Sequence, residues 1–291
     1  MSMASLRKVR RTVANAVFTG FCWLVTGVAL FALALILWSL ATQGFGGMNL
    51  NVFTTPTEPS GSPGGLLNAI VGSVITCTLA MIMAVIVGVL AGTWLAEYGG
   101  ESVYAKLIRF LNDILLSAPS VLIGLFVYNI LVAHVIGHFS AIAGAVALAL
   151  IAVPIITRTT EDVLKLQPIA LRESGVALGS PHWTTIRKIL WRSATSGILT
   201  GGLLAFARIS GETAPLLFTA LGNQYFSVGL REPLFGLGQP IAALPLVIFQ
   251  YAMSPYDDWQ RLAWAGALII AAAVLGTNIL ARIVTRERRP S

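Results

Sequence analysis

The chain has 291 residues, of which 56% are hydrophobic and only 11% charged, and it carries a formal net charge of +7. Soluble domains average about 25% charged residues, so this composition excludes an ordinary soluble protein and predicts one that lies in lipid. The basic residues cluster between apolar runs and form no single basic face, which argues against a nucleic-acid partner.

Six apolar runs, each about the length that a bilayer requires, predict six membrane-spanning helices and an all-α polytopic fold. The first run follows a basic segment and is longer than the apolar core of a secretory signal peptide, so we expect an uncleaved span. The runs cover residues 16–41, 68–96, 110–136, 139–157, 194–222 and 259–283.

The predicted domain organisation is one separate span followed by a core of five helices. In chain order we expect an N-terminal tail (1–15), the first transmembrane helix (16–41), a loop rich in Gly, Pro, Ser and Thr (42–67), the core (68–284) and a C-terminal tail (285–291). Within the core, 158–192 form a basic loop. The proline-rich segment 223–258 has an apolar part too short and too broken to span, which predicts an interfacial or re-entrant element.

The distribution of Lys and Arg predicts the orientation in the membrane. Of the 19 basic residues, 16 lie in the N-terminal tail, in the loop after the second run, in residues 158–192 and at the C-terminal end from Arg282 onward. The positive-inside rule makes that side cytoplasmic. Both termini are therefore expected in the cytoplasm, with 42–67 and 223–258 outside.

Residues 158–192 contain two short helical patterns separated by Gly179 and Pro181. Their sequence resembles the EAA loop of the membrane subunits of ABC transporters, although Ser and Gly replace the two alanines of that motif. The resemblance implies an all-α permease of the type I importer class whose coupling helix docks on a cytoplasmic ATPase. The implied contact residues are Glu173, Ser174, Gly175, Gly179, Ser180 and Pro181.

Longer stretches are similar to phosphate-uptake ABC permeases of the PstA type, from about residue 68 to 282. They read AEYG at 96–99, IRFLNDILLSAPSVLIGLFVY at 108–128, RTTE at 158–161 and ARISGETAPLLFTAL at 207–221. This resemblance implies a multi-pass, non-catalytic subunit of a bacterial inner-membrane importer. The implied partners are a homologous permease (PstC-like), two ATPase subunits (PstB-like) that hold ATP and magnesium, and a periplasmic phosphate-binding protein (PstS-like). This chain itself is expected to bind no cofactor.

Arg208 and Glu212 are charged residues near the middle of the fifth apolar run, where each charge costs about 2.5–3.5 kcal/mol. They are four residues apart, so they can touch on one helical face. One interpretation is that Arg208 offers a two-pronged contact to phosphate, with Glu212 orienting it or accepting the proton of HPO4²⁻. The other is that the pair only locks this span to a neighbouring subunit.

Three further residues lie on or near the expected substrate path. Thr213, with Gly211 and Pro215, is expected to loosen the fifth span beside the charged pair. Arg158, at the cytoplasmic end of the fourth span, is a second candidate, although snorkelling to lipid headgroups explains it as well. Asp113 lies four residues after Arg109, which predicts an ion pair within one helix.

Several function classes lack the residues that they require. The sequence contains no GxxxxGK[ST] phosphate loop, no nucleophile–base constellation and no Cys or His spacing typical of a metal site. Two alternatives remain: a permease for another oxyanion, such as sulfate or molybdate, and an ion-coupled secondary transporter that works alone. The EAA-like loop and the lack of an evident inverted repeat count against the second alternative.

Overall fold

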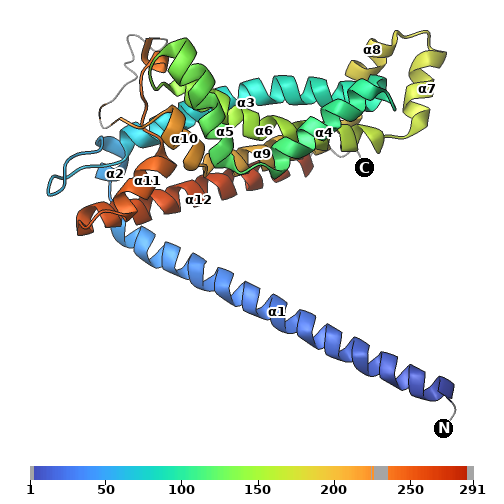
Figure 1. Cartoon of the computed structure of the whole chain (residues 1–291), viewed down its shortest axis with the longest axis horizontal. Coiled ribbons are helices and arrows are strands. Elements are labelled where there is room, and N and C mark those ends of the chain that lie inside the picture. The colour runs from blue at the N-terminus through green and yellow to red at the C-terminus, as the bar shows by residue number, and fades with distance from the viewer. Residues whose placement is uncertain (1–2, 224, 226–234, 287–291) are drawn as a thin grey trace.

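The computed structural model describes residues 3–223, 225 and 235–286, and nearly all of them are helical (Figure 1). The predicted all-α fold is confirmed. Parts of the predicted segments 1–15, 223–258 and 285–291, namely 1–2, 224, 226–234 and 287–291, lie outside the described residues. The α-helices are α1 (Met3–Gly47), α2 (Asn51–Thr54), α3 (Leu67–Trp94), α4 (Val103–Ser117), α5 (Ser120–Val127), α6 (Ala141–Lys165), α7 (Ile169–Ala177), α8 (His182–Thr185), α9 (Trp191–Ser210), α10 (Ala214–Thr219), α11 (Leu244–Ala252) and α12 (Asp257–Arg286).

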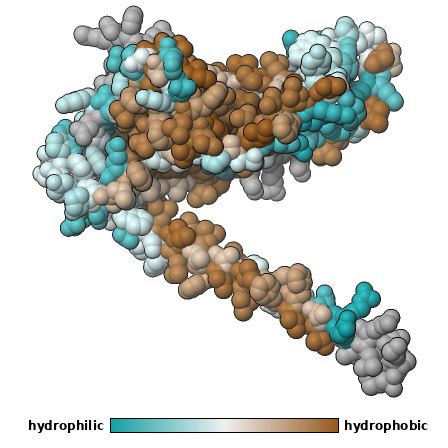
Figure 2. All heavy atoms as spheres, viewed as in Figure 1, coloured by the Kyte–Doolittle hydropathy of each residue, from teal (hydrophilic) through white to brown (hydrophobic). Residues whose placement is uncertain are grey.

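Short segments with other helical geometry continue some of these helices. Three are π-helical, η1 (Leu95–Gly99), η2 (Tyr128–Ile136) and η3 (Ile186–Leu190), and η4 (Phe235–Gly238) is a 3₁₀-helix. Figure 1 places α7 and α8 at one end of the helical bundle, and α2, α11 and the start of α12 at the other. Hydrophobic atoms cover the middle of the bundle and α1, whereas polar atoms gather at the two ends (Figure 2). This pattern is that of a protein surrounded by lipid at its middle.

Among the residues that the structure describes, four helical stretches are each long and apolar enough to cross a membrane: Arg10–Gly47, Leu67–Gly99, Ala141–Lys165 and Asp257–Ile279. The pair Val103–Ser117 and Ser120–Ile136 makes a fifth if it counts as one broken span. The remaining predicted span, the fifth apolar run (194–222), corresponds to α9 and α10, which are interrupted and less apolar. The six-span count is consistent with this architecture and stays a prediction.

The α3 and α6 helices pack most closely, because small residues recur along their contact. A Cβ added to Gly88 would come within 2.8 Å of Cβ of Ile156, and one added to Gly92 within 2.7 Å of Cβ of Thr160. The residue numbers of the contacting pairs rise together along both helices, so the two helices run in the same direction. Small residues at every fourth position let helix backbones approach within a membrane. The buried α3 residues of this stripe are Thr76, Ala80, Ala84, Gly88 and Gly92, whereas Gly72, one turn earlier, lies against the backbone of Ala242.

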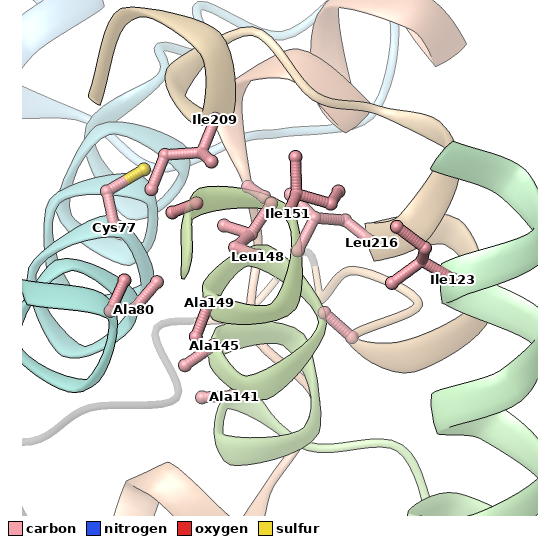
Figure 3. Packing of buried hydrophobic residues seen from close by; sticks show 14 of the residues in the cluster. Cys77, Ala80, Ile123, Ala141, Ala145, Leu148, Ala149, Ile151, Ile209 and Leu216 are labelled. Atoms are coloured by element: carbon pink, nitrogen blue, oxygen red, sulfur yellow. The ribbon is translucent and has the colours of Figure 1, made fainter. Parts of the chain in front are cut away.

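The α9 helix packs on another face of α6 in the opposite direction. Gly197 lies against Val163 and Gly201 against Thr159, so numbers rise along α9 as they fall along α6. Further along this contact, Ile209 reaches the centre of the main core beside α3 and α6 (Figure 3). The α9 helix is therefore held by the two central helices along most of its length.

Residues 110–136, predicted as one span, do not form a single helix. The α4 helix ends at Ser117, Ala118 and Pro119 are extended, and α5 starts at Ser120 with a bend of 107° from α4. Proline has no N–H to donate and disfavours a helical conformation in the residue before it. The chain still reaches the far end of the bundle, where α6 begins.

The α1 helix leaves the bundle and projects away from it (Figure 1). Its contacts with α12 lie near its own C-terminal end, where Gly44 meets Leu268 and Gly47 meets the backbone of Arg261. At the same end of the bundle, α11 packs on α12, and Tyr251 stacks on Trp259 with ring centres 4.6 Å apart. With nine residues, α11 is too short to span, as the broken apolar segment predicts.

Candidate functional site

Arg208 and Glu212 form an ion pair between Nη1 and Oε1, as their spacing predicts. The two side chains differ sharply in exposure, because the Glu212 side chain is 6% exposed and that of Arg208 is 54% exposed. The contact lacks hydrogen-bond geometry, so Oε1 of Glu212 is buried without a hydrogen-bond partner among the described residues. The pair thus consists of an inward carboxylate and an outward guanidinium.

The ion pair lies at an interruption of the fifth predicted span, as Gly211, Thr213 and Pro215 lead one to expect. The α9 helix ends at Ser210, and α10 begins at Ala214 with Pro215 in its first turn. The N–H of Glu212 donates to the carbonyl of Ile209 at 3.2 Å, which turns the chain out of the helix. Arg208 therefore sits in the last turn of α9, where the helix dipole favours a cation.

Buried neighbours on both sides hold this interruption in place. Ile209 is 1% exposed and Leu216 is 2% exposed, and both belong to the main core (Figure 3). A Cβ on Gly124 of α5 would come within 2.7 Å of Cα of Pro215, so α5 and α10 are in close contact. The backbone around Arg208 is fixed by α5, α6 and α10, while its own side chain reaches outward.

The structure brings Thr213 next to the ion pair but leaves Arg158 apart from it. The Thr213 carbonyl accepts from the N–H of Leu217 at 3.1 Å and so starts α10. The antiparallel packing of α6 on α9 places Arg158 about six residues, or about 9 Å, from the level of Arg208, toward the α7 end. The two arginines therefore occupy different depths.

Arg158 has acidic partners of its own. Its Nε lies 3.3 Å from Oδ2 of Asp162, and its Nη1 lies 4.0 Å from Oδ1 of Asp113. The expected pair between Asp113 and Arg109 is wrong, because Arg109 turns toward α6 instead. Nε of Arg109 donates to Oε1 of Glu161 at 2.8 Å.

Residues of the EAA-like loop form a compact helical hairpin of α7 and α8. Gly175 is buried against Thr185, and a Cβ at this position would overlap the Thr185 side chain. Gly179 adopts φ +69°, the left-handed conformation that glycine takes at little cost at a helix C-terminus. Ser180 donates its N–H to the carbonyl of Gly175 at 3.0 Å, and Pro181 precedes α8.

The outer surface of this hairpin carries exposed side chains of two kinds. Glu173 and Ser174 are exposed, and the Ser174 hydroxyl donates back to the carbonyl of Leu171 at 2.9 Å. Beside them lie exposed large apolar residues. These are Leu166, Ile169, Val176 and Leu178, between 65% and 84% exposed.

Two buried carboxylates at the base of the hairpin were missed by reasoning from the sequence. Glu97 and Glu161 are each 3% exposed. Glu161 accepts from Arg109 and, at 2.6 Å, from Lys165, whose i,i+4 spacing is a signal that the sequence does contain. Glu97 binds Arg172, 75 residues away, and no sequence pattern announces that pair. Its hydrogen bonds hold the pKa of the Arg172 guanidinium above its usual value.

Within the described part of the chain, no three His, Cys, Asp or Glu side chains are grouped so that they could hold a metal ion. Cys22 is exposed on α1 and Cys77 is buried on α3, and both are free thiols.

Comparisons with known proteins agree with this architecture. The family described as binding-protein-dependent transport system inner membrane component matches residues 85–290. The phosphate transport system permease protein PstA of Haemophilus influenzae is 49% identical over 98% of both chains. The protein of the same name from Xylella fastidiosa is 51% identical over the full length of both, and PstA 1 of Mycobacterium tuberculosis is 32% identical over 97% of this chain and 92% of its own.

The fold is also similar to solved ABC transporters. A chain of the MetNI methionine ABC transporter, solved in inward-facing conformations, superposes with a TM-score of 0.61 at 15% sequence identity, over 77% of this chain and 96% of that one. An amino acid ABC transporter superposes with a TM-score of 0.50 at 20% identity, over 75% and 92%. At these identities the likeness concerns the fold. The match over residues 85–290 and the full-length PstA relatives show that the chain belongs to the binding-protein-dependent transport system inner membrane components, in the branch of its PstA relatives.

Proposed function

We propose that this chain is the permease subunit of an ATP-driven importer of inorganic phosphate and that Arg208 lines the anion path. The observation that carries the proposal is the asymmetric ion pair, in which a buried Glu212 holds a half-exposed Arg208. The names of the relatives from Haemophilus influenzae and Xylella fastidiosa support phosphate as the substrate.

The chemistry of the pair suits a protonated oxyanion. A guanidinium has five N–H groups, so contact with one carboxylate oxygen leaves donors for two phosphate oxygens. In this proposal the Glu212 carboxylate beside the guanidinium accepts the proton of HPO4²⁻ in a hydrogen bond once the anion has entered between the two side chains. Sulfate has no proton to donate at neutral pH, so the same carboxylate repels it.

In this proposal the energy for transport comes from ATP hydrolysis on other subunits. In this proposal the α7–α8 hairpin, with Glu173 and its exposed apolar residues, docks on a cytoplasmic ATPase pair that holds ATP and magnesium. A homologous permease completes the anion path, and a periplasmic binding protein delivers phosphate to it. This arrangement places both termini of the chain on the cytoplasmic side of the inner membrane, as the basic residues predict.

ATP-dependent uptake of radioactive phosphate into proteoliposomes that contain the complete importer tests the anion path. Arg208→Gln is expected to lower uptake about thirtyfold or more, because it removes the cation that the anion binds and leaves the buried Glu212 carboxylate without its partner, a loss of about 2 kcal/mol or more. Arg208→Lys should recover only part of the activity, since a single ammonium cannot bind two oxygens in a fixed plane.

The matched control is Arg261→Gln, which removes an exposed arginine near the N-terminal start of α12 and should leave uptake unchanged. Glu212→Gln should lower uptake and weaken the preference for phosphate over sulfate in competition. Wild-type uptake by Arg208→Gln would refute the anion path, and equal competition by sulfate or molybdate would refute phosphate selectivity.

A further inference from the structure

Arg172, one residue before Glu173 in the α7 helix, uses its guanidinium to bind the ends of two long helices. Nε and Nη2 donate to the two carboxylate oxygens of Glu97 at 3.0 and 2.7 Å. Nη2 also donates to the carbonyl of Leu164 at 2.8 Å, and Nη1 donates to that of Gln167 at 2.9 Å. Glu97 belongs to η1, which continues α3, and Leu164 lies in the last turn of α6.

The η1 segment that carries Glu97 is itself held from several sides. Tyr98 contacts His182 of α8 edge to face, with ring centres 5.1 Å apart. Arg109 of α4 donates to the carbonyls of Leu95 and Gly100 at 3.2 and 3.1 Å. The same Arg109 binds Glu161 of α6. Both halves of the hairpin therefore contact η1, α7 through Arg172 and α8 through His182.

We propose that Arg172 and Glu97 form the joint that passes movement of the α7–α8 hairpin to α3 and α6. The inference rests on the proposed function, in which an ATPase moves this hairpin. Both are positioning residues, because neither contacts the transported anion.

The geometry of the contact suits the transfer of movement. A guanidinium bound to both carboxylate oxygens is fixed in its plane as well as in distance, whereas a single hydrogen bond can pivot. Glu97 is 3% exposed, so water cannot replace Arg172 without leaving a buried charge poorly paired. The hairpin cannot move far while α3 and α6 stay in place.

The same contact leads toward the charged pair of the anion path. The α6 helix, held by Arg172 at its end, packs along α9 through Val163 against Gly197 and Thr159 against Gly201. Arg208 lies in the last turn of α9. A shift of α6 at the hairpin end is therefore carried along this packed contact to Arg208.

The test uses the complete importer in proteoliposomes and measures phosphate transported per ATP hydrolysed. Arg172→Gln and Glu97→Gln are expected to lower this ratio at least fivefold while ATP hydrolysis continues. Arg172→Lys keeps a positive charge beside Glu97, so it serves as the test if Arg172→Gln does not assemble, and it should lower the ratio by a smaller factor. The double variant should be no worse than Arg172→Gln, because both remove the same contact.

Lys106→Gln is the matched control, because its ion pair with Glu101 is exposed on both sides (63% and 90%). Its ratio should equal that of wild type. A purely structural tether would lower the yield of assembled complex but leave the ratio unchanged. A ratio within twofold of wild type in both Glu97→Gln and Arg172→Lys would overturn the proposal.

A second measurement does not depend on the substrate. Spin labels at Val176 of α7 and Val87 of α3, both exposed, report their separation in a background with Cys22→Ser and Cys77→Ala. ATP should leave this distance unchanged in the otherwise wild-type complex and should alter it in Arg172→Gln. A distance that responds to ATP in the same way in both would overturn the joint.

The two measurements separate the joint from the proposed function. A wild-type complex that hydrolyses ATP and transports no phosphate would refute the proposed substrate, while the label distances would still decide the joint. If no ATPase assembles with the wild-type chain, both proposals are wrong.

Discussion

Substituting Gly92 by alanine is expected to push the central helices α3 and α6 apart. The added Cβ would lie 2.5 Å from the carbonyl oxygen of Thr157 and 2.7 Å from Cβ of Thr160. An ordinary carbon–oxygen contact is about 3.3–3.6 Å, so α6 would have to move by about 0.8–1.1 Å. The contacts are with backbone and a branched Cβ, neither of which can rotate away.

The magnitude follows from two opposing effects. Overpacking a tight contact costs about 1–3 kcal/mol, and alanine gains about 0.5–1 kcal/mol over glycine in a helix interior. The net expectation for Gly92→Ala is a loss of about 1–2 kcal/mol in the free energy of unfolding. This corresponds to a fall in the thermal midpoint of roughly 2–8 °C, at about 2–4 °C per kcal/mol.

The assay is thermal unfolding of the purified chain in one detergent, with two glycine controls. Gly202→Ala should keep or slightly raise the midpoint, because nothing lies within 4 Å of its added Cβ. Gly144→Ala should fall between the two, since its nearest contact is the rotatable end of Leu216 at 3.2 Å. If Gly92→Ala unfolds at the same temperature as Gly202→Ala, the close packing of α3 on α6 is refuted.

Two more predictions use the same measurement. Leu221 has φ 59°, a left-handed conformation that costs about 1–2 kcal/mol for a residue with a Cβ. Leu221→Gly should therefore raise the thermal midpoint, and Gly222→Ala, at φ +92°, should lower it. The opposite order would contradict this backbone conformation. Glu161→Ala should cost about 3 kcal/mol, because it leaves the largely buried Arg109 without its carboxylate. Lys165→Met, which removes a half-exposed partner of Glu161, should cost less than about 1 kcal/mol, and equal losses for the two would refute the buried role of Glu161.

Features that depend on neighbouring residues could be predicted from the sequence. Apolar runs of about 20 residues or more, enough for a helix to cross a bilayer, predicted the long helices. The four-residue spacing of Arg208 and Glu212 predicted their contact, and Gly211 with Pro215 predicted the interruption that follows α9. These predictions succeed because hydropathy, helix periodicity and the missing N–H of proline act within a few residues of the chain.

Other features depend on which helices meet, and only the tertiary structure decided them. The pairing of Glu97 with Arg172 joins residues 75 positions apart. Arg109 binds Glu161, 52 residues away, although Asp113 lies only four residues after it in the sequence. The break at Pro119 could be suspected, but its angle of 107° could not. In lipid all apolar faces look alike, so packing of small residues and pairing of buried charges select the neighbours. That selection also decided that Arg208 faces outward while Glu212 is buried.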